Sequence, residues 1–335
     1  FETLPDSASL RTQFVHLYVK DLSEGGESSN KPFEDYGLFT HIEQPNKQFL
    51  KNHWLDPNGL LYKAAMFEFF RYPDELKSES DPAYDPALFE KRLEIRGREE
   101  HGKLLDMLDA VNDYSIPIEQ VIDKYFDLDN YLTWMAANIL MDNMDTSAAN
   151  YLLYSPLNSD KWYFIPWDYD GGWELQRRRN SIGEANSGIS NYWGVVLHNR
   201  FLRIPANVQK LKDKIDELYE STINGSLEKR INEYRSVVEP FMARMPDRGF
   251  LPVSLREIDD QYQILIETPL RSIERFNEDM ERPKPFFLGD FVQENGISRF
   301  TWEPSFDLQG DDLTYDFAIA RDPLFTEIVH EQSGL

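Results

Sequence analysis

Alternating apolar and polar positions near the start of the chain predict a β-hairpin. Residues 14–19 (FVHLYV) and 36–42 (YGLFTHI) are rich in aromatic and β-branched side chains, as strands usually are. The polar residues 24–32 between them contain Gly-Gly and Ser-Ser, which favour a long connecting loop. After the hairpin, we expect a helix at 48–54 and a further apolar segment at 60–70.

A buried helix just before residue 141 is the clearest element that the pattern predicts. Either Asp127 or Asp129 can cap its N-terminus, and apolar side chains recur along one of its faces. This stripe consists of Leu132, Met135, Ala136, Ile139 and Leu140. Upstream, residues 87–111 have a charged helical pattern, and Pro117 suits the first position of another helix.

A second hairpin is expected after the buried helix. The apolar residues 151–154 and 162–165 flank a polar turn at 155–160. A polar loop is expected at 174–192. Three long helical patterns come later, at 206–222, 226–243 and 254–280.

The pattern changes from helical to alternating at a Pro-Lys-Pro sequence, residues 283–285, where we expect a linker. Residues 298–302 and 314–319 alternate as strands do, which favours an all-β segment. We therefore expect two domains. The first is an α+β domain over 1–282, and the second is the start of a β-sandwich over 283–335.

Composition narrows the class of protein. Among 335 residues, 59 are acidic and 35 basic, so the net charge of −24 repels phosphate backbones and disfavours nucleic acid as a partner. Cysteine is absent, which excludes disulfides, thiolate catalysis and cysteine zinc sites. No apolar run approaches the roughly 18 residues of a membrane span, so we expect none in this portion. The chain starts at Phe1 without a leader pattern, which indicates a removed signal peptide or a missing N-terminus.

Candidate chemistry is concentrated between the buried helix and residue 173. Four residues separate Asp145 from Asn150, and Asp168 and Asp170 follow the second hairpin. The order helix, Asp-x4-Asn, hairpin, Asp is that of the protein-kinase catalytic and metal loops. There the first Asp accepts the hydroxyl proton, and the Asn and second Asp hold Mg²⁺ on the phosphates through oxygen ligands. Ordinary acidic turns are an alternative explanation for each of these residues.

The segment DLDNYLTWMAANILMDNMDTSAANYLLYSPLNSDKWYFIPWDYDGGW resembles the core of the CotH (spore coat protein H) kinase family. Its Asn-Tyr-x-x-Tyr and Pro-Trp-Asp-x-Asp elements are the most specific part of the likeness, and DYGLFTHIEQPNKQF with GLLYKA resembles the upstream segment of that family. The likeness implies an atypical protein-kinase-like fold with a mostly helical C-lobe and partial N-lobe strands. It also implies bound ATP, Mg²⁺ or Mn²⁺, and phosphoryl transfer to Ser or Thr hydroxyls of a protein substrate.

The same resemblance implies roles for particular residues. By position, Asp145 is the catalytic residue, Asn150 and Asp168 hold the metal, and Asp170 has a secondary role in holding it. In an ordinary kinase His-Arg would precede the catalytic Asp, whereas Asn-Met stands there in this chain.

Two weaker candidates border the implied nucleotide cleft. Glu43 would edge the cleft and Lys63 would contact a phosphate, although both also suit exposed surface charges. The arginines at 177–179 could receive an acidic substrate, with a solvated loop as the favoured alternative. No Gly-rich phosphate loop or strand-borne phosphate lysine is evident before Phe14. We therefore expect those elements upstream of this chain, and this portion alone to be inactive.

The C-terminal segment, RFTWEPSFDLQGDDLTYDFAIARDPLFTEIV, resembles the opening strands of a fibronectin type III module. Trp302 and Tyr315 fit that pattern. Such modules are typical of secreted or surface proteins with several domains. The resemblance therefore implies a bacterial protein exported to the cell surface or beyond, of which this chain lacks both ends.

Two other functions stay open at this point. A catalytically inactive member of the family would serve as a surface scaffold that binds a partner. A glycosidase would use Asp168 and Asp170 as paired carboxylates about 5 Å or roughly 6.5–9.5 Å apart, with nearby tryptophans as sugar platforms. Convergence of Asp145, Asn150 and Asp168 on one point would favour phosphoryl transfer over the glycosidase.

Overall fold

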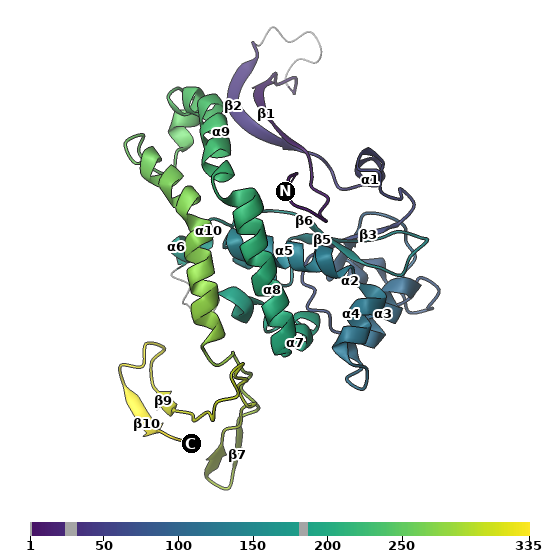
Figure 1. The fold of residues 1–335 in the computed structure, drawn as a ribbon, viewed down its shortest axis with the longest axis vertical. Helices are drawn as coiled ribbons and strands as arrows, with labels where there is room; N and C mark the ends of the chain where they lie inside the picture. The colour runs from purple at the N-terminus through teal and green to yellow at the C-terminus, as the bar shows by residue number, and fades with distance from the viewer. Residues whose placement is uncertain (1, 24–31, 181–186) are drawn as a thin grey trace.

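A computed structural model describes residues 2–23, 32–180 and 187–335 (Figure 1). Helices and strands are mixed along this part of the chain, which is compatible with the expected α+β class. The described strands are β1 (Thr12–Val19), β2 (Glu34–Ile42), β3 (Leu60–Ala64), β4 (Leu93–Ile95), β5 (Tyr151–Ser155), β6 (Tyr163–Pro166), β7 (Val292–Glu294), β8 (Ile297–Arg299), β9 (Phe317–Ala320) and β10 (Ile328–Gln332). The described α-helices are α1 (Lys47–Asn52), α2 (Pro86–Phe89), α3 (Gly102–Asn112), α4 (Ile118–Tyr125), α5 (Leu128–Leu140), α6 (Leu175–Asn180), α7 (Val196–Leu202), α8 (Pro205–Leu218), α9 (Ser226–Met242) and α10 (Ile258–Met280).

Strands β1 and β2 form the first expected hairpin, with Thr12 opposite Ile42. The connection predicted at 24–32 falls almost entirely outside the described residues. No third strand pairs with this hairpin in the part of the chain that the structure describes. Figure 1 shows the hairpin projecting from the body, with α9 beside it.

Helix α9, which comes nearly 200 residues later in the chain, packs on this hairpin. The rings of Phe14 and Tyr234 meet edge to face at a centroid distance of 5.9 Å. Beyond α9, Oδ1 of Asp247 accepts the backbone N–H of Leu38 at 2.9 Å. Gly37 is required for this approach, because its φ is +87° and an added Cβ would lie 2.4 Å from Oδ2 of Asp247. The hairpin is therefore held by a helix that no local pattern connects to it.

A four-stranded antiparallel sheet, in the order β4-β3-β5-β6, forms one side of the core. The predicted hairpin of β5 and β6 is confirmed. The helix predicted at 87–111 is wrong, because this segment forms α2, β4 and α3. Leu93 and Ile95 belong to β4, which pairs with β3. The chain then passes so close to β3 at Gly97 that a Cβ would lie 2.8 Å from the amide nitrogen of Leu61.

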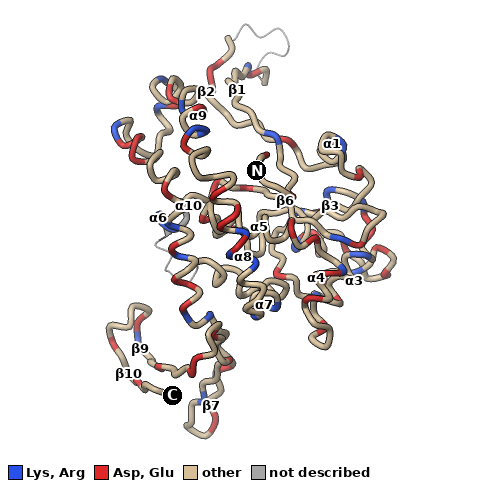
Figure 2. The backbone as a smooth tube through the Cα atoms, in the orientation of Figure 1, with Lys and Arg blue, Asp and Glu red and all other residues tan. Residues whose placement is uncertain are grey.

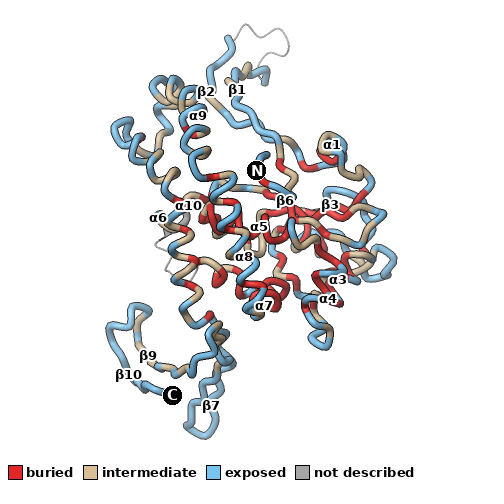
Figure 3. Tube along the Cα trace, in the orientation of Figure 1, coloured by how far each residue is buried: buried red, intermediate tan, exposed pale blue. Residues whose placement is uncertain are grey.

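Helix α5 lies at the centre of the core. The side chain of Asp127 caps it, as expected, by accepting the N–H of Asn130 at 3.0 Å. Every residue from 130 to 140 is buried, so the helix is enclosed on all sides rather than along one stripe. Trp134 stacks on Phe164 of β6 at 4.5 Å between centroids. Figure 3 shows the buried positions gathered around α5, whereas the hairpin β1–β2 and the C-terminal segment are largely exposed.

The loop predicted at 174–192 is wrong in part. Helix α6 begins at Leu175, and a 3-10 helix covers Gly188–Tyr192, with residues 181–186 outside the description. Helix α7 was not predicted, because its 7 residues are too few for a clear helical period. The three long helices are confirmed as α8, α9 and α10.

The residues after α10 form two separate hairpins, β7–β8 and β9–β10. The all-β character of this segment is confirmed, whereas the fibronectin type III resemblance stays a prediction. The expected linker is wrong at its middle residue, because Lys284 is buried. Its Nζ lies 3.2 Å from Oδ1 of Asp279, and its N–H donates to the carbonyl of Phe306 at 2.8 Å. Phe306 in turn packs on Trp193 of the main body at 5.5 Å, so the segment is docked at its base.

Charge is spread over the whole molecule. Asp and Glu positions occur along every region of the trace, with Lys and Arg interspersed (Figure 2). The net charge of −24 is therefore not the property of one face. Within the described ranges, none of the helices combines the length and the apolar character that crossing a membrane requires.

Candidate active site

Two loops meet at the C-terminal end of helix α5. Residues 141–150, which we call the Asp145 loop, lead to β5, and residues 167–174, the Asp168 loop, follow β6. The N–H of Trp173 donates across the two loops to the carbonyl of Met141 at 2.6 Å. Gly172 permits this approach, because a Cβ there would lie 3.2 Å from the same carbonyl oxygen. The two loops, which the hairpin β5–β6 separates in the sequence, are thus in direct contact.

Both loops hold residues in the left-handed backbone region. Positive φ angles occur at Asp142 (47°), Asn150 (58°), Asp168 (59°), Trp173 (60°) and Glu174 (61°). Asn and Asp tolerate this region better than most side chains, whereas for Trp and Glu the strain costs about 1–3 kcal/mol each. Such conformations persist only where surrounding contacts impose them, and they cluster at functional sites.

Asp145, the expected catalytic residue, and Asn150, an expected metal ligand, are joined by a hydrogen bond. Nδ2 of Asn150 donates to Oδ2 of Asp145 at 2.8 Å. Oδ1 of Asn150 receives no hydrogen bond from the described residues, so it is available to a cation. Burial raises the pKa of Asp145 and the charge of Asp170 raises it further, whereas the bond from Asn150 opposes both.

Asp168 lies in the same electrostatic environment. Burial raises the pKa of Asp168, as do the charge of Asp170, a hydrogen bond with it and the charge of Asp145. Lys63 acts in the opposite direction and lowers that pKa. The structure therefore brings Asp145, Asn150, Asp168 and Asp170 into one cluster.

This cluster fits a divalent cation whose coordination shell is completed by oxygen atoms of a ligand. The mutual repulsion of Asp145, Asp168 and Asp170 is relieved when a cation binds between them. Searched over the described ranges, no three His, Asp or Glu side chains already form a metal cage. Mg²⁺ usually binds one or two carboxylates together with waters and phosphate oxygens, so a complete cage is not required. Asn150 and Asp168 are the residues that would hold it.

Lys63 lies beside the cluster but already has a partner. Its Nζ is 3.1 Å from Oε1 of Glu94 on the neighbouring strand β4. It also lies 5.9 Å from the ring centroid of Trp167, next to Asp168. Lys63 is therefore positioned to influence Asp168, and its contact with a phosphate stays a prediction.

Glu43 is not part of the cluster. Its carboxylate accepts Nδ2 of Asn52 at 2.8 Å, Nε2 of His53 at 2.8 Å and the N–H of Arg11 at 3.2 Å. These bonds tie the end of β2 to the end of α1. The residue of this strand end that faces a cavity is Ile42. A structural role thus accounts for every contact of Glu43.

A cavity of about 630 Å³ opens beside the Asp168 loop. Its lining includes Asp168 and Asp170, Ile42 from β2, and Arg230 and Tyr234 from α9. This volume is within the roughly 300–1,000 Å³ that small-ligand sites usually have. The acidic cluster is therefore accessible to a ligand of nucleotide size from the side of the Asp168 loop.

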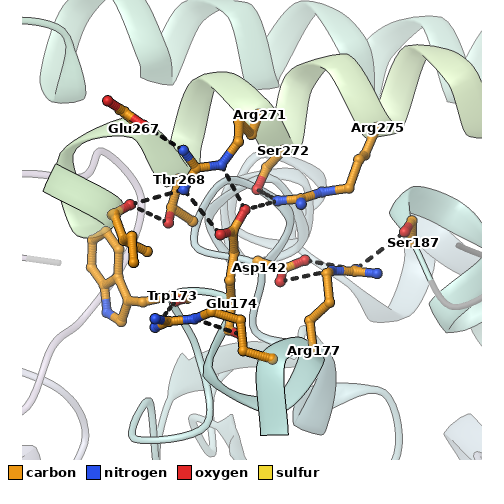
Figure 4. Close-up of polar contacts among 12 residues, drawn as sticks. Asp142, Trp173, Glu174, Arg177, Ser187, Glu267, Thr268, Arg271, Ser272 and Arg275 are labelled. Atoms are coloured by element: carbon orange, nitrogen blue, oxygen red, sulfur yellow. Dashed lines mark hydrogen bonds and ion pairs between the residues drawn. The ribbon is translucent and has the colours of Figure 1, made fainter. Parts of the chain in front are cut away.

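Helix α10 holds the Asp168 loop through the buried carboxylate of Glu174 (Figure 4). Nε and Nη2 of Arg271 donate to its two oxygens, both at 2.9 Å, and Nη2 of Arg275 donates at 2.6 Å. Burial raises the pKa of Glu174, but the two arginines outweigh it and bring the pKa below its usual value. The last residue of the loop is thus fixed to a long helix.

A second ion pair ties the Asp145 loop to α6. Nη2 of Arg177 donates to Oδ1 of Asp142 at 2.9 Å and to Oγ of Ser187 at 3.1 Å (Figure 4). Arg177 was expected either to receive an acidic substrate or to lie in a solvated loop. Both expectations are wrong, because its guanidinium group is directed inward and paired with Asp142. Arg178 donates to Oε1 of Gln261 at 3.0 Å, and the side chain of Arg179 lies outside the description.

These anchoring residues were missed by sequence reasoning. The only signal is local, namely two arginines spaced i, i+4 on α10, which places Arg271 and Arg275 on one helix face. No pattern in the sequence indicates that their common partner is Glu174.

The fold and site define an α+β protein whose central buried helix leads into an acidic cluster beside a ligand-sized cavity. The CotH family model, described as CotH kinase protein, matches residues 6–268, and the chain belongs to this family. Inner spore coat protein H of Bacillus subtilis (strain 168) is 28% identical over 141 residues, which are 41% of this chain and 37% of that protein. The match thus extends over little more than a third of that relative.

Proposed function

We propose that this chain is part of an atypical protein kinase that transfers the γ-phosphoryl group of ATP to Ser or Thr hydroxyls of a protein. The observation that carries the proposal is the hydrogen bond between Asn150 and Asp145, at 2.8 Å, within the electrostatic reach of Asp168 and Asp170. Family membership supports it, because the family is described as a kinase.

In this proposal, Asp145 accepts the proton of the attacking hydroxyl. Its raised pKa makes it a stronger base than an ordinary aspartate, and Asn150 holds its carboxylate in orientation. The hydroxyl oxygen forms the new bond to the γ-phosphorus, the bond to the β,γ-bridging oxygen breaks, and ADP leaves. Asn150 and Asp168 hold Mg²⁺ or Mn²⁺, which when bound neutralises charge on the phosphates.

The two carboxylates of the Asp168 loop disfavour the glycosidase alternative. Asp168 lies in one cluster with Asp145 and Asn150, whereas a glycosidase would need Asp168 and Asp170 to face each other as a pair across an open cleft. For the acceptor, we infer a protein of a bacterial surface layer, because the relative is an inner spore coat protein. On this basis the protein acts outside the cytoplasm, at the cell surface or in a coat.

The test is phosphate transfer by the full-length protein that contains this chain. Labelled γ-phosphate should pass to a generic acceptor or to the protein itself with Mg²⁺ or Mn²⁺, and Asp168→Ala should remove the signal. Protein that binds ATP but transfers no phosphate, across cations and acceptors, would instead favour a catalytically inactive scaffold.

A further inference from the structure

Arg230 lines the 630 Å³ cavity from helix α9, and its side chain has no partner among the described residues. It is half-buried, and across the described ranges its guanidinium group makes neither an ion pair nor a hydrogen bond. The chain has 59 acidic residues, yet this arginine has no carboxylate partner among the described residues. Its guanidinium group, which faces the cavity, is therefore available to an external anion.

The charges around the cavity are separated rather than paired. Asp168 and Asp170 contribute to its lining from the Asp168 loop, yet no ion pair joins either of them to Arg230. The cavity therefore has carboxylates at one part of its wall and a guanidinium group at another, with open space between them. A cation bound by the carboxylates and an anion bound by Arg230 would give alternating negative and positive charges across the cavity, which attract one another.

The other basic residues near the cavity are already engaged. Lys63 is paired with Glu94 at 3.1 Å. Nη2 of Arg11, which also lines the cavity, donates to the carbonyl of Asn52 at 3.3 Å. Arg230 is thus the basic residue here that has no protein partner within the described residues.

Helix α9 presents Arg230 in a fixed position. Tyr234 lies one turn further along the same helix face and also lines the cavity. Its ring packs edge to face on Phe14 of β1 at 5.9 Å. The position of Arg230 relative to the hairpin β1–β2 is therefore set by packing, which reduces the entropy lost when it binds a ligand.

We propose that Arg230 binds a phosphate group of the nucleotide whose cation is held at Asp168. A planar guanidinium group donates two parallel hydrogen bonds to phosphate oxygens, which suits this role better than a point charge. The inference rests on the proposed function, and it assigns to α9 a share of the phosphate-binding charge that kinases usually place on a strand-borne lysine.

The test compares nucleotide binding by the full-length protein and its variants in calorimetric titrations. Arg230→Met should weaken binding of Mg²⁺–ATP about tenfold or more and leave adenosine binding unchanged, because only the phosphate contact is lost. Arg230→Lys should retain part of the affinity. Arg256→Met is the matched control, since Arg256 is exposed before α10 and does not line the cavity, and it should bind as wild type does.

The outcomes separate this inference from the proposed function. Unchanged affinity of Arg230→Met for Mg²⁺–ATP would overturn the inference alone. Equal loss of ATP and adenosine binding, accompanied by a lower melting temperature, would show a structural role and also overturn it. A raised KM for the acceptor with unchanged nucleotide affinity would assign Arg230 to the acceptor instead. Wild-type protein that binds no nucleotide would overturn both proposals.

Discussion

Glu174 in the Asp168 loop and Arg271 in helix α10 form a bidentate ion pair, with both nitrogen–oxygen distances at 2.9 Å. Glu174 is 7% exposed, and Arg275 donates to its carboxylate as well. The residue that ends the metal-binding candidate loop is therefore fixed by a helix about a hundred residues later in the chain. Loss of this pair should affect both stability and the geometry of the cluster.

Glu174→Gln should destabilise the fold by about 3 kcal/mol, because it leaves two arginines beside a buried site without their carboxylate. Chemical denaturation of wild type and variant measures the change. Glu267→Gln is the control: Glu267 also accepts from Arg271, at 2.6 Å, but is well exposed, so its removal should cost about 0.5 kcal/mol. Equal effects of the two substitutions would contradict the anchoring role of Glu174.

The same carboxylate should make stability depend on pH. The pKa of Glu174 in the folded protein lies below its usual value of 4.5. Its stabilising contribution is thus fully present above about pH 4.5 and is lost as the pH falls through the lowered folded pKa. The gap in melting temperature between wild type and Glu174→Gln should be constant from pH 7 to 5 and should close at lower pH. Scanning calorimetry at a series of pH values checks this, and a gap that widens below pH 4 would refute it.

Asp168→Ala should abolish phosphate transfer by the full-length protein, since it removes the main carboxylate for the cation. Asp170→Ala should reduce transfer less, because Asp170 acts on the cluster chiefly through its charge. Asp160→Ala, in the exposed turn between β5 and β6, serves as the control and should be as active as wild type. A larger loss from Asp170→Ala than from Asp168→Ala would reverse the assignment of the metal ligand.

Asp145→Ala should lower turnover by about 10²–10⁴-fold while nucleotide affinity stays within about threefold of wild type. The reason is that a residue that receives the hydroxyl proton acts on the transferring step and not on binding. Single-turnover transfer and equilibrium titration of ATP separate the two effects. Loss of nucleotide binding in this variant would instead make Asp145 a ligand of the cation.

The 335-residue chain on its own should bind Mg²⁺–ATP weakly or not at all. We expect this because the residues before Phe14 show neither a Gly-rich phosphate loop nor a strand-borne phosphate lysine. Calorimetric titration of this chain, with the full-length protein alongside, tests the point. Equally tight binding by both would mean that the nucleotide site is complete within these residues.

Local features of the sequence predicted the centre of the molecule well. The Asp127 cap of α5, its buried position and the hairpin β5–β6 depend on residues that are close in the chain, as does the hydrogen bond between Asn150 and Asp145. Short-range hydrogen bonding and side-chain periodicity determine such elements, so a pattern within a few residues is sufficient.

Features that depend on distant residues could not be predicted in the same way. The residues of β4 were expected to be helical because they lie within a helical pattern. They form a strand of 3 residues because they pair with β3, which is distant in the sequence. The charged partner of Glu174 and the position of Arg230 depend on how α9 and α10 pack, which no local pattern specifies. Tertiary context therefore determined the residues around the cluster, whereas the sequence motif indicated only its centre.

The walls of the cavity have a consequence for the order in which the protein matures. Tyr234 and Phe14 contact each other although they are far apart in the sequence, so a nascent chain cannot close the cavity until α9 has left the ribosome. At roughly 5–20 residues per second, the stretch of about 220 residues from Phe14 to Tyr234 takes on the order of 10–50 s to synthesise. Before α9 emerges, both acidic loops have been synthesised, but the side of the cavity that α9 lines is still missing. The protein thus acquires its ligand site late, after most of its core has had time to fold.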